Sequence, residues 1–197
     1  MSTELNVFHN WSNHYIMQEN TGDWFNLDSE SFVTDCAADE ECLAVYQATQ
    51  SNARFYGFEA QLIFPLWEGE DNQFDMTLFS DFVRGELVSG GNVPRMPPLR
   101  YGFQFDYFGY DAFSAGLRLT RAESQTHVGE NETPTAGYIL LDANVSYQVQ
   151  LADKYDLLLF VKGNNLLNET IRNSTSFLKD YAPEPGRGAE IGFRVSF

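Results

Sequence analysis

Apolar and polar side chains alternate strictly through the carboxyl-terminal segment, from Arg187 to Phe197. Strand side chains point to opposite faces with a period of two, so this segment is predicted to be a β-strand with one apolar and one polar face. The segment ends on an aromatic residue, and an outward face of Ile, Phe, Val and Phe suits contact with lipid. The apolar face would carry Ala189, Ile191, Phe193, Val195 and Phe197.

The same alternation recurs through most of the chain. In residues 53–66, for example, Tyr56, Phe58 and Ala60 alternate with Gly57 and Glu59. The segment 3–17 is extended but ambiguous, because its aromatic residues and histidines do not separate onto two faces. No helical period longer than about two turns interrupts the pattern. The sequence therefore predicts about eight strands, at 3–17, 53–66, 74–82, 99–107, 113–120, 139–149, 155–161 and 187–197.

The connections between these predicted strands alternate between long and short. Antiparallel strands place every second connection at the same end of a sheet, so all the long ones are expected at one end. Strands of roughly ten residues are long enough to cross a bilayer at a tilt. Together these features predict an all-β, antiparallel transmembrane β-barrel, with a secreted sandwich as the alternative. The long connections are 18–52, 89–98, 126–135 and 168–186, and the short ones are 67–72, 109–111 and 151–154.

Composition narrows the classes of function. The chain has 12 Lys and Arg against 28 Asp and Glu, a net charge of −16, which argues against a nucleic-acid partner because phosphate binding needs a basic face. Aromatic residues make up 15% of the chain, which favours strands. The longest apolar runs are too short for a transmembrane helix. The amino terminus has neither the basic nor the apolar region of a signal peptide.

Two cysteines, Cys36 and Cys42, lie six residues apart in an acidic stretch. A disulfide across this small loop would fit an oxidising compartment such as the periplasm or the cell surface. A metal site is less favoured, because zinc sites have closer cysteine pairs and further ligands nearby.

Several short motifs are more specific than the periodicity. In their order and spacing they resemble the carboxyl-terminal portion of TonB-dependent receptors of Gram-negative outer membranes, over essentially the whole chain. Two further motifs, RNSTSFLKD (172–180) and PGR (185–187), resemble the branch linked to zinc uptake. The motifs that carry the family resemblance are FYGFEA (55–60), DFVRGEL (81–87), VPRMPPLRYG (93–102), ETPTAGY (132–138) and GNNLLNE (163–169).

The resemblance implies a barrel of about 22 strands with a plugged lumen. Residues 1–197 would be its carboxyl-terminal segment, with the plug domain absent and no cofactor. It further implies outer-membrane lipid, the TonB complex (through the missing plug region), the barrel-assembly machinery and a small metal or metal-chelate ligand as partners. The terminal strand, with Phe193, Val195 and Phe197, would be the barrel-assembly signal. A stand-alone eight-stranded barrel acting as an anchor or adhesin is the alternative.

Candidate metal ligands lie in the predicted loop 126–135, where His127 is close in sequence to Glu130 and Glu132. Nitrogen and oxygen donors of this kind suit a borderline metal ion, although ordinary solvated loop residues have the same composition. The acidic stretch 18–52 would concentrate cations near the mouth of the barrel. The sequence contains no HExxH motif, nucleophile elbow or phosphate-binding loop, so an enzyme is not predicted.

Overall fold

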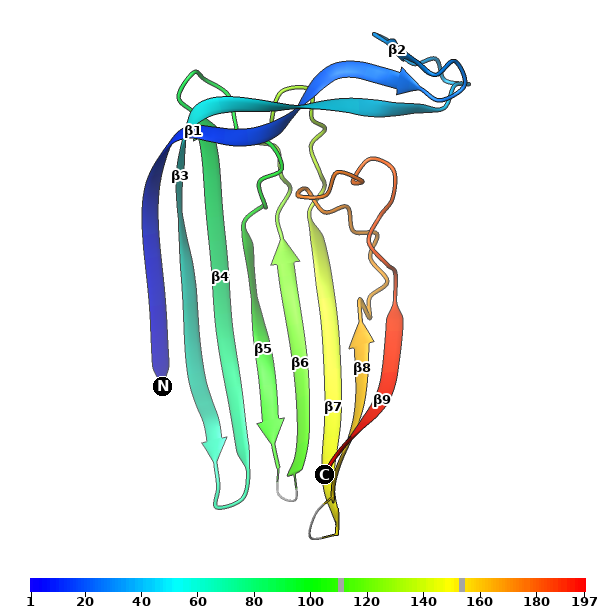
Figure 1. The fold of residues 1–197 in the computed structure, drawn as a ribbon. Coiled ribbons are helices and arrows are strands. Elements are labelled where there is room, and N and C mark those ends of the chain that lie inside the picture. The colour runs from blue at the N-terminus through cyan, green and yellow to red at the C-terminus, as the bar shows by residue number, and fades with distance from the viewer. Residues whose placement is uncertain (110–111, 153–154) are drawn as a thin grey trace.

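A single antiparallel sheet makes up the computed structural model, which describes residues 1–109, 112–152 and 155–197. The strands follow the order β2-β1-β3-β4-β5-β6-β7-β8-β9, so every neighbouring pair except β1 and β3 is also consecutive in sequence (Figure 1). The strands are β1 (Ser2–Asn26), β2 (Ser31–Val33), β3 (Cys42–Glu68), β4 (Gln73–Leu87), β5 (Arg100–Phe108), β6 (Phe113–Ala122), β7 (Tyr138–Ala152), β8 (Tyr155–Asn164) and β9 (Gly188–Ser196). The all-β antiparallel prediction is confirmed.

The prediction of a long loop at 18–52 is wrong. β1 continues to Asn26 and β3 begins at Cys42, so the connection shrinks to residues 27–41 and contains the short strand β2. Polar side chains do not end a strand whose backbone groups are paired, and the β1–β3 ladder continues to the pair Asn26 and Cys42. β2 also raises the number of strands from the predicted eight to nine among the described residues.

Two irregularities bend the long β1–β3 pair. The register shifts between Ser12 and Tyr15 and again between Asn20 and Trp24, as expected for β-bulges, which bend and twist a strand. At the first shift His14 has a positive φ of 57°, and its backbone N–H donates to the Asn52 side chain at 3.0 Å. Beyond it, residues 15–51, which we call the outer hairpin, turn across the loop end of the sheet (Figure 1).

The two faces of the sheet differ as the alternation predicts. Opposite residues such as Leu62 and Leu78, or Leu78 and Phe103, share the apolar face. Large apolar side chains on this face are uncovered, including Val7 at 72% and Ile191 at 80% exposure. A soluble sandwich would bury such a face against a second sheet, and the described chain has a single sheet.

The long connections lie together at one end of the sheet and the short ones at the other, as predicted (Figure 1). The short β3–β4 turn is closed by the Gly69 N–H, which donates to the Asn72 carbonyl at 2.8 Å. Two predicted short turns, at 109–111 and 151–154, include residues 110, 111, 153 and 154, which lie outside the described residues. No helix in the described ranges is long and apolar enough to cross a membrane.

The buried apolar side chains lie where the long loops meet the sheet, and not along the sheet face. The set with less than a tenth of its surface exposed is Met17, Ala53, Val93, Ala122 and Ile171. The hydrophobic core therefore sits beneath the loops. At the sides of the sheet, within the described residues, β9 pairs only with β8 and the first half of β1 pairs only with β3, so the described sheet is open.

Candidate site at the loop end of the sheet

Four segments meet above the sheet, and we call them together the cap. They are the outer hairpin, the β4–β5 loop (88–99), the β6–β7 loop (123–137) and the β8–β9 loop (165–187). Each of the three loops makes polar contact with the outer hairpin. Arg95 donates to the Gln18 carbonyl at 2.7 Å, Asn20 and Asn131 exchange side chain-to-backbone hydrogen bonds at 3.1 Å, and the Tyr181 hydroxyl accepts from Ala44 N–H at 3.1 Å.

Arg95 is the centre of the cap. Its guanidinium lies 4.0 Å from the centroid of the Phe177 ring and 5.7 Å from that of Tyr46, and the two rings are themselves in edge contact. Its Nη1 atom is 3.5 Å from Glu132 Oε1, and the two side chains are only 13% and 2% exposed. Arg95 also has a positive φ of 54°, a conformation that costs a non-glycine residue about 1–3 kcal/mol and persists only where its surroundings fix it.

Glu132, one of the predicted metal ligands, is bound to Arg95 in the cap. Its carboxylate accepts hydrogen bonds from the backbone N–H groups of Arg95 (3.1 Å) and Gly129 (3.0 Å) in addition to the ion pair. His127 and Glu130 are exposed in the same loop. Among the described residues, the ligand atoms of His127, Glu130 and Glu132 do not form a group within 4.8 Å of one another. A metal site at these three residues stays a prediction.

The β8–β9 loop adds a buried cation. Lys179 is 3% exposed, and its ammonium group donates to the Thr133 carbonyl at 2.9 Å, while Thr133 Oγ1 donates to Asp180 at 2.5 Å. Tyr46 lies in this neighbourhood, and burial, reinforced by the negative charge of Glu132, raises the pKa of its hydroxyl above the ordinary value of 10.0. The cap thus contains a network of charged and aromatic groups in which Arg95, Glu132 and Lys179 are largely buried, while the Phe177 ring is 42% exposed.

Sequence reasoning missed the buried polar groups that join the loops from below. Gln125 donates from Nε2 to the carbonyls of Met96 (3.1 Å) and Pro97 (3.0 Å), and Ser174 donates to the same Met96 carbonyl at 3.0 Å. Gln125 and Ser174 are 7% and 3% exposed. The proline-rich stretch was the signal in the sequence for these contacts. Prolines have no N–H group to donate, so carbonyls of such a loop must accept hydrogen bonds from other segments.

Asn165 lies at the point where β8 leaves the sheet. Its side chain donates to the carbonyls of Glu169 (2.9 Å) and Pro185 (3.3 Å) and accepts from the Glu169 N–H at 2.9 Å. The residue is 3% exposed and has a positive φ of 49°, which Asn tolerates better than most residues. It fixes the start of the β8–β9 loop and ties it to Pro185 near the loop's end.

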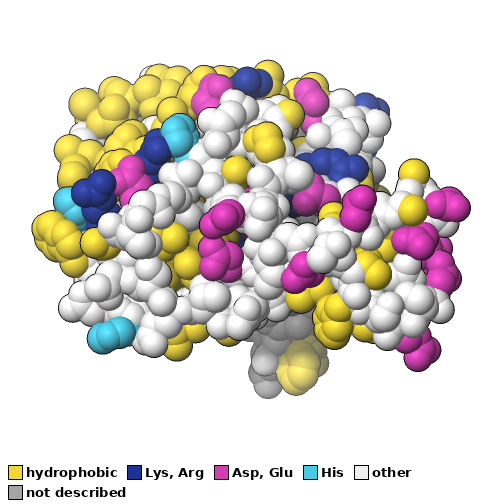
Figure 2. Space-filling model, turned by 90° about the horizontal axis from the view of Figure 1, so that it is seen from above, with side chains coloured by type: hydrophobic (Ala, Val, Ile, Leu, Met, Phe, Trp, Pro, Cys, Tyr) yellow, Lys and Arg dark blue, Asp and Glu magenta, His cyan; other side chains and the backbone are white. Residues whose placement is uncertain are grey.

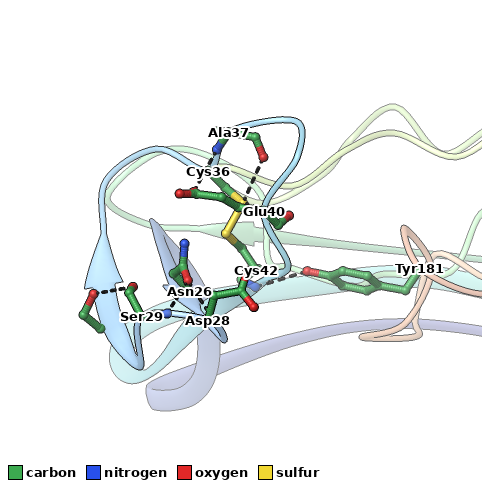
Figure 3. Close-up of a disulfide and its surroundings, with 10 residues drawn as sticks. Asn26, Asp28, Ser29, Cys36, Ala37, Glu40, Cys42 and Tyr181 are labelled. Atoms are coloured by element: carbon green, nitrogen blue, oxygen red, sulfur yellow. Dashed lines mark hydrogen bonds between the residues drawn. A yellow bond between two sulfur atoms is a disulfide. The ribbon is translucent and has the colours of Figure 1, made fainter.

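Cys36 and Cys42 are joined by a disulfide at the tip of the outer hairpin (Figure 3). Around it, Asn26 Oδ1 accepts from the N–H groups of Asp28 and Ser29 at 2.9 and 2.8 Å, forming the turn that leads to β2. Cys36, Glu40 and Cys42 form the one group of potential metal ligands within 4.8 Å in the described ranges, but disulfide sulfurs do not act as thiolate ligands.

Acidic side chains gather over this tip, at the right of the view down onto the cap (Figure 2). The tip therefore presents negative potential to the solvent above the cap, which raises the local concentration of cations. The exposed carboxylates of the connection 27–41 are Asp28, Glu30, Asp35, Asp39, Glu40 and Glu41.

The polar face of the sheet continues downward from the cap as a wall of polar and charged side chains that bind one another. Arg100 binds Asp81 across the β4–β5 ladder at 3.0 Å, and Arg118 donates to Gln104 at 2.8 Å while its guanidinium lies 3.9 Å from the centroid of the Phe79 ring. A hollow of about 310 Å³ lies against this part of the wall. Such a face suits water or other protein, in contrast to the opposite apolar face.

At the far side of the sheet, Phe193 and Phe197 are 72% and 98% exposed, and Val195 is 44% exposed. β9 pairs with β8 through Leu157 and Val195 and through Leu159 and Phe193, so these side chains continue the apolar face. Their part in barrel assembly stays a prediction.

An antiparallel sheet with one lipid-like face, one polar face and all its long loops at one end is the wall of an outer-membrane type of β-barrel. The chain matches the family model of the TonB-dependent receptor-like β-barrel over residues 1–166, and it belongs to that family. Its fold is similar to that of a solved structure, the copper transporter OprC, with a TM-score of 0.68 at 19% sequence identity. The match covers 99% of this chain and 29% of the transporter, so the chain spans less than a third of that protein's length.

Proposed function

We propose that the chain is the carboxyl-terminal part of the barrel of a TonB-dependent receptor of the Gram-negative outer membrane, which imports a metal ion, a siderophore or another scarce nutrient. The observation that carries this proposal is the pairing of an uncovered apolar sheet face with a folded, carboxylate-rich cap at one end. Family membership supports the transport function, and the name of the copper transporter with the same fold favours metal among the possible cargoes.

In this proposal the chain supplies a section of barrel wall and of the extracellular surface. The acidic tip of the outer hairpin attracts cationic cargo, and the cap controls how it reaches the polar wall below. The Arg100–Asp81 pair and Arg118 face the lumen, where they can contact the cargo or the plug. Energy coupling through the TonB complex would come from parts of the receptor other than residues 1–197.

Metal capture by the β6–β7 loop is a more specific proposal. His127 is exposed, and the adjacent cavity of about 180 Å³ is lined by its own side chain together with those of Arg84 and Glu123. His127 and Glu130 are free to rotate toward a metal ion, whereas Glu132 would first have to leave Arg95. Isothermal calorimetry of the full-length receptor with Cu²⁺ and Zn²⁺ tests this site, with His127→Ala as the variant and His9→Ala as the control.

The transport function is tested by deleting the complete gene from its host and measuring cell-associated metals under chelator stress. We expect the deletion strain to hold less of one metal and to grow poorly, and the full-length gene to restore both. A variant of the full-length gene without the TonB-contacting segment should fail to restore them. Unchanged metal content and unchanged growth on every chelated nutrient would contradict the proposal.

A further inference from the structure

The tip of the outer hairpin brings three metal-binding side chains together, although two of them are joined by the disulfide. The sulfur atoms of Cys36 and Cys42 and a carboxylate oxygen of Glu40 all lie within 4.8 Å of one another. The Glu40 side chain lies beside the disulfide (Figure 3). The two cysteines are partly exposed and Glu40 is exposed, so small molecules from the solvent can reach the group.

The turn that contains Glu40 holds its side chain in this place. Its Oε2 atom accepts a hydrogen bond from the Ala37 N–H at 3.2 Å, and its own N–H donates to the Ala37 carbonyl at 3.1 Å. Among the described residues, no group donates a hydrogen bond to its other carboxylate oxygen, Oε1. Glu40 therefore keeps an oxygen that can bind a metal ion while the turn stays formed.

Backbone contacts on both sides of the disulfide keep the two cysteines close to each other independently of the S–S bond. Cys42 is paired with Asn26 at the end of the β1–β3 ladder, and the Leu27 N–H donates to the Glu41 carbonyl at 2.8 Å. Shortly before Cys36, β2 is paired with β1. Reduction of the disulfide would therefore leave two thiols within reach of a single ion.

Two thiolates and one carboxylate are a set of ligands that suits zinc. Zn²⁺ binds cysteine sulfur and carboxylate oxygen in tetrahedral sites, and with three protein ligands its fourth position can hold water. Zinc–sulfur bonds of about 2.3 Å place two ligand sulfurs about 3.8 Å apart. The Cα atoms of the cysteines are 6.3 Å apart, so rotation of the two side chains is enough to reach this separation. Glu40 is the further ligand that the cysteine spacing alone does not reveal.

The position of the tip suits reversible reduction. Exposed disulfides are reduced more readily than buried ones, and the exposed carboxylates of the connection 27–41 attract cations to the same place. The cap does not depend on the disulfide, because Arg95 makes its contacts with Gln18, Glu132 and Phe177. The disulfide can therefore open and close without loosening the cap.

We propose that the tip is a redox-controlled zinc site, closed to metal while Cys36 and Cys42 form the disulfide and open once it is reduced. The reductant is a low-molecular-weight thiol. Its thiolate attacks one sulfur and forms a mixed disulfide while the other cysteine leaves as a thiolate, and a second thiol then releases the first cysteine. Two small thiols become one small disulfide, and the cysteines gain two electrons and two protons. Zn²⁺ then binds both sulfurs and Glu40, and the two protons pass to the solvent.

The test uses the full-length receptor in detergent micelles, either oxidised or reduced with a small thiol that is removed before metal is added. Co²⁺ is the probe, because cobalt bound to thiolate has a sulfur-to-metal charge-transfer absorption that carboxylate and imidazole sites lack. We expect this absorption in the reduced receptor alone, and we expect a stoichiometric amount of Zn²⁺ to abolish it. The Cys36→Ser/Cys42→Ser variant should not show it under either condition.

The Glu40→Gln variant tests the third ligand and leaves both cysteines in place. It should keep the thiolate absorption but bind Zn²⁺ at least about tenfold more weakly, since even the loss of an outer-shell partner typically lowers metal affinity by that factor. Glu30→Gln is the matched control, because it removes the same charge from an exposed position of the same connection. It should bind Zn²⁺ as the wild type does.

Four results would overturn the site. They are thiolate absorption in the oxidised receptor, its absence from the reduced receptor, its persistence in the double cysteine variant, and equal Zn²⁺ affinity of Glu40→Gln and the wild type. A disulfide that withstands the small thiol would overturn the redox control. The inference goes beyond the proposed transport function and does not depend on it. A receptor that imports metal but lacks the thiolate absorption would overturn the tip site alone.

Discussion

The carboxylate of Glu132, in the β6–β7 loop, holds the guanidinium of Arg95, in the β4–β5 loop, at 3.5 Å in a part of the cap that solvent hardly reaches. The backbone N–H of Arg95 also donates to Glu132, so the carboxylate fixes both the side chain and the main chain of its partner. The same arginine reaches the outer hairpin through the Gln18 carbonyl and the β8–β9 loop through Phe177. One ion pair therefore connects all four segments of the cap.

Replacing Arg95 with alanine is expected to loosen the cap without unfolding the sheet. Removing one partner of a buried ion pair typically costs about 3–5 kcal/mol, because the other charge stays buried and uncompensated. Two backbone donors still satisfy Glu132, so we expect about 3 kcal/mol, which corresponds to roughly a hundredfold faster amide exchange in the outer hairpin. Hydrogen exchange of the full-length receptor measures this. Arg187→Ala, at an exposed position of the β8–β9 loop, is the control.

The Arg95→Lys variant separates charge from shape. Lysine keeps the positive charge but loses the planar stacking against Phe177 and the second donor direction toward Gln18. We expect exchange rates between those of the wild type and Arg95→Ala. If Arg95→Ala protects the outer hairpin as well as the wild type does, Arg95 does not hold the cap.

Tyr46 gives the cap a dependence on alkaline pH. Burial and the nearby Glu132 raise the pKa of its hydroxyl, so the folded cap favours the neutral phenol. The contribution to stability is fully present below the unfolded pKa near 10.0 and is lost as pH rises through the higher folded pKa. The cap should therefore weaken above about pH 10.

A difference titration at 295 nm between the wild type and Tyr46→Phe isolates this phenol from the others. We expect one tyrosine with a midpoint above 10.0 in the difference curve, and reduced alkaline loosening of the outer hairpin in Tyr46→Phe. Tyr155→Phe, at an exposed position at the opposite end of the sheet, serves as the control. A midpoint at or below the ordinary tyrosine value would contradict the assignment of Tyr46 to a buried acidic environment.

The disulfide should matter only at the tip of the outer hairpin. The disulfide joins residues with a sequence separation of 6. Closing a loop of that length lowers the entropy of the unfolded tip, which stabilises the folded tip by about 2 kcal/mol. We expect the Cys36→Ser/Cys42→Ser variant to exchange faster in residues 27–41 and to be cleaved there by proteases. Protection around Arg95 should not change, because its contacts come from Gln18, Glu132 and Phe177. Loss of protection throughout the cap would show that the disulfide holds more than the tip.

The sheet was largely predictable from the sequence because each strand between β4 and β9 has one apolar and one polar face. The two faces impose alternation, as in Phe103, Phe105 and Tyr107 of β5, and this alternation can be recognised in one strand without knowing its neighbours. The outer hairpin turns away from this part of the sheet (Figure 1). Both of its faces can be polar there, so the alternation of apolar and polar residues is lost in the segment 18–52. The backbone nevertheless stays paired as far as Asn26 and Cys42.

The candidate site was predictable only in part, because it is assembled from distant segments. His127, Glu130 and Glu132 are neighbours in sequence, but Glu132 pairs with an arginine 37 residues away, which sequence spacing cannot reveal. Asn165, by contrast, makes a local contact, with the carbonyl and N–H of Glu169 in the loop that it begins. The positive φ of Arg95 likewise follows from contacts with other loops and has no signal of its own.

Glycines of the polar face allow a further test of the sheet, because two of them lie directly opposite phenylalanines, Gly102 opposite Phe79 and Gly192 opposite Phe160. A Cβ on Gly102 would lie 2.0 Å from the Leu119 carbonyl oxygen, so alanine there would have to displace backbone. A Cβ on Gly192 would lie 2.4 Å from Phe160 Cζ, and its nearest atoms all belong to a ring that can rotate away. We expect Gly102→Ala to cost about 2 kcal/mol and Gly192→Ala less than about 1 kcal/mol. The temperature at which the refolded receptor loses its compact migration on a gel compares the two, and equal shifts would contradict the distinction between backbone and ring contact.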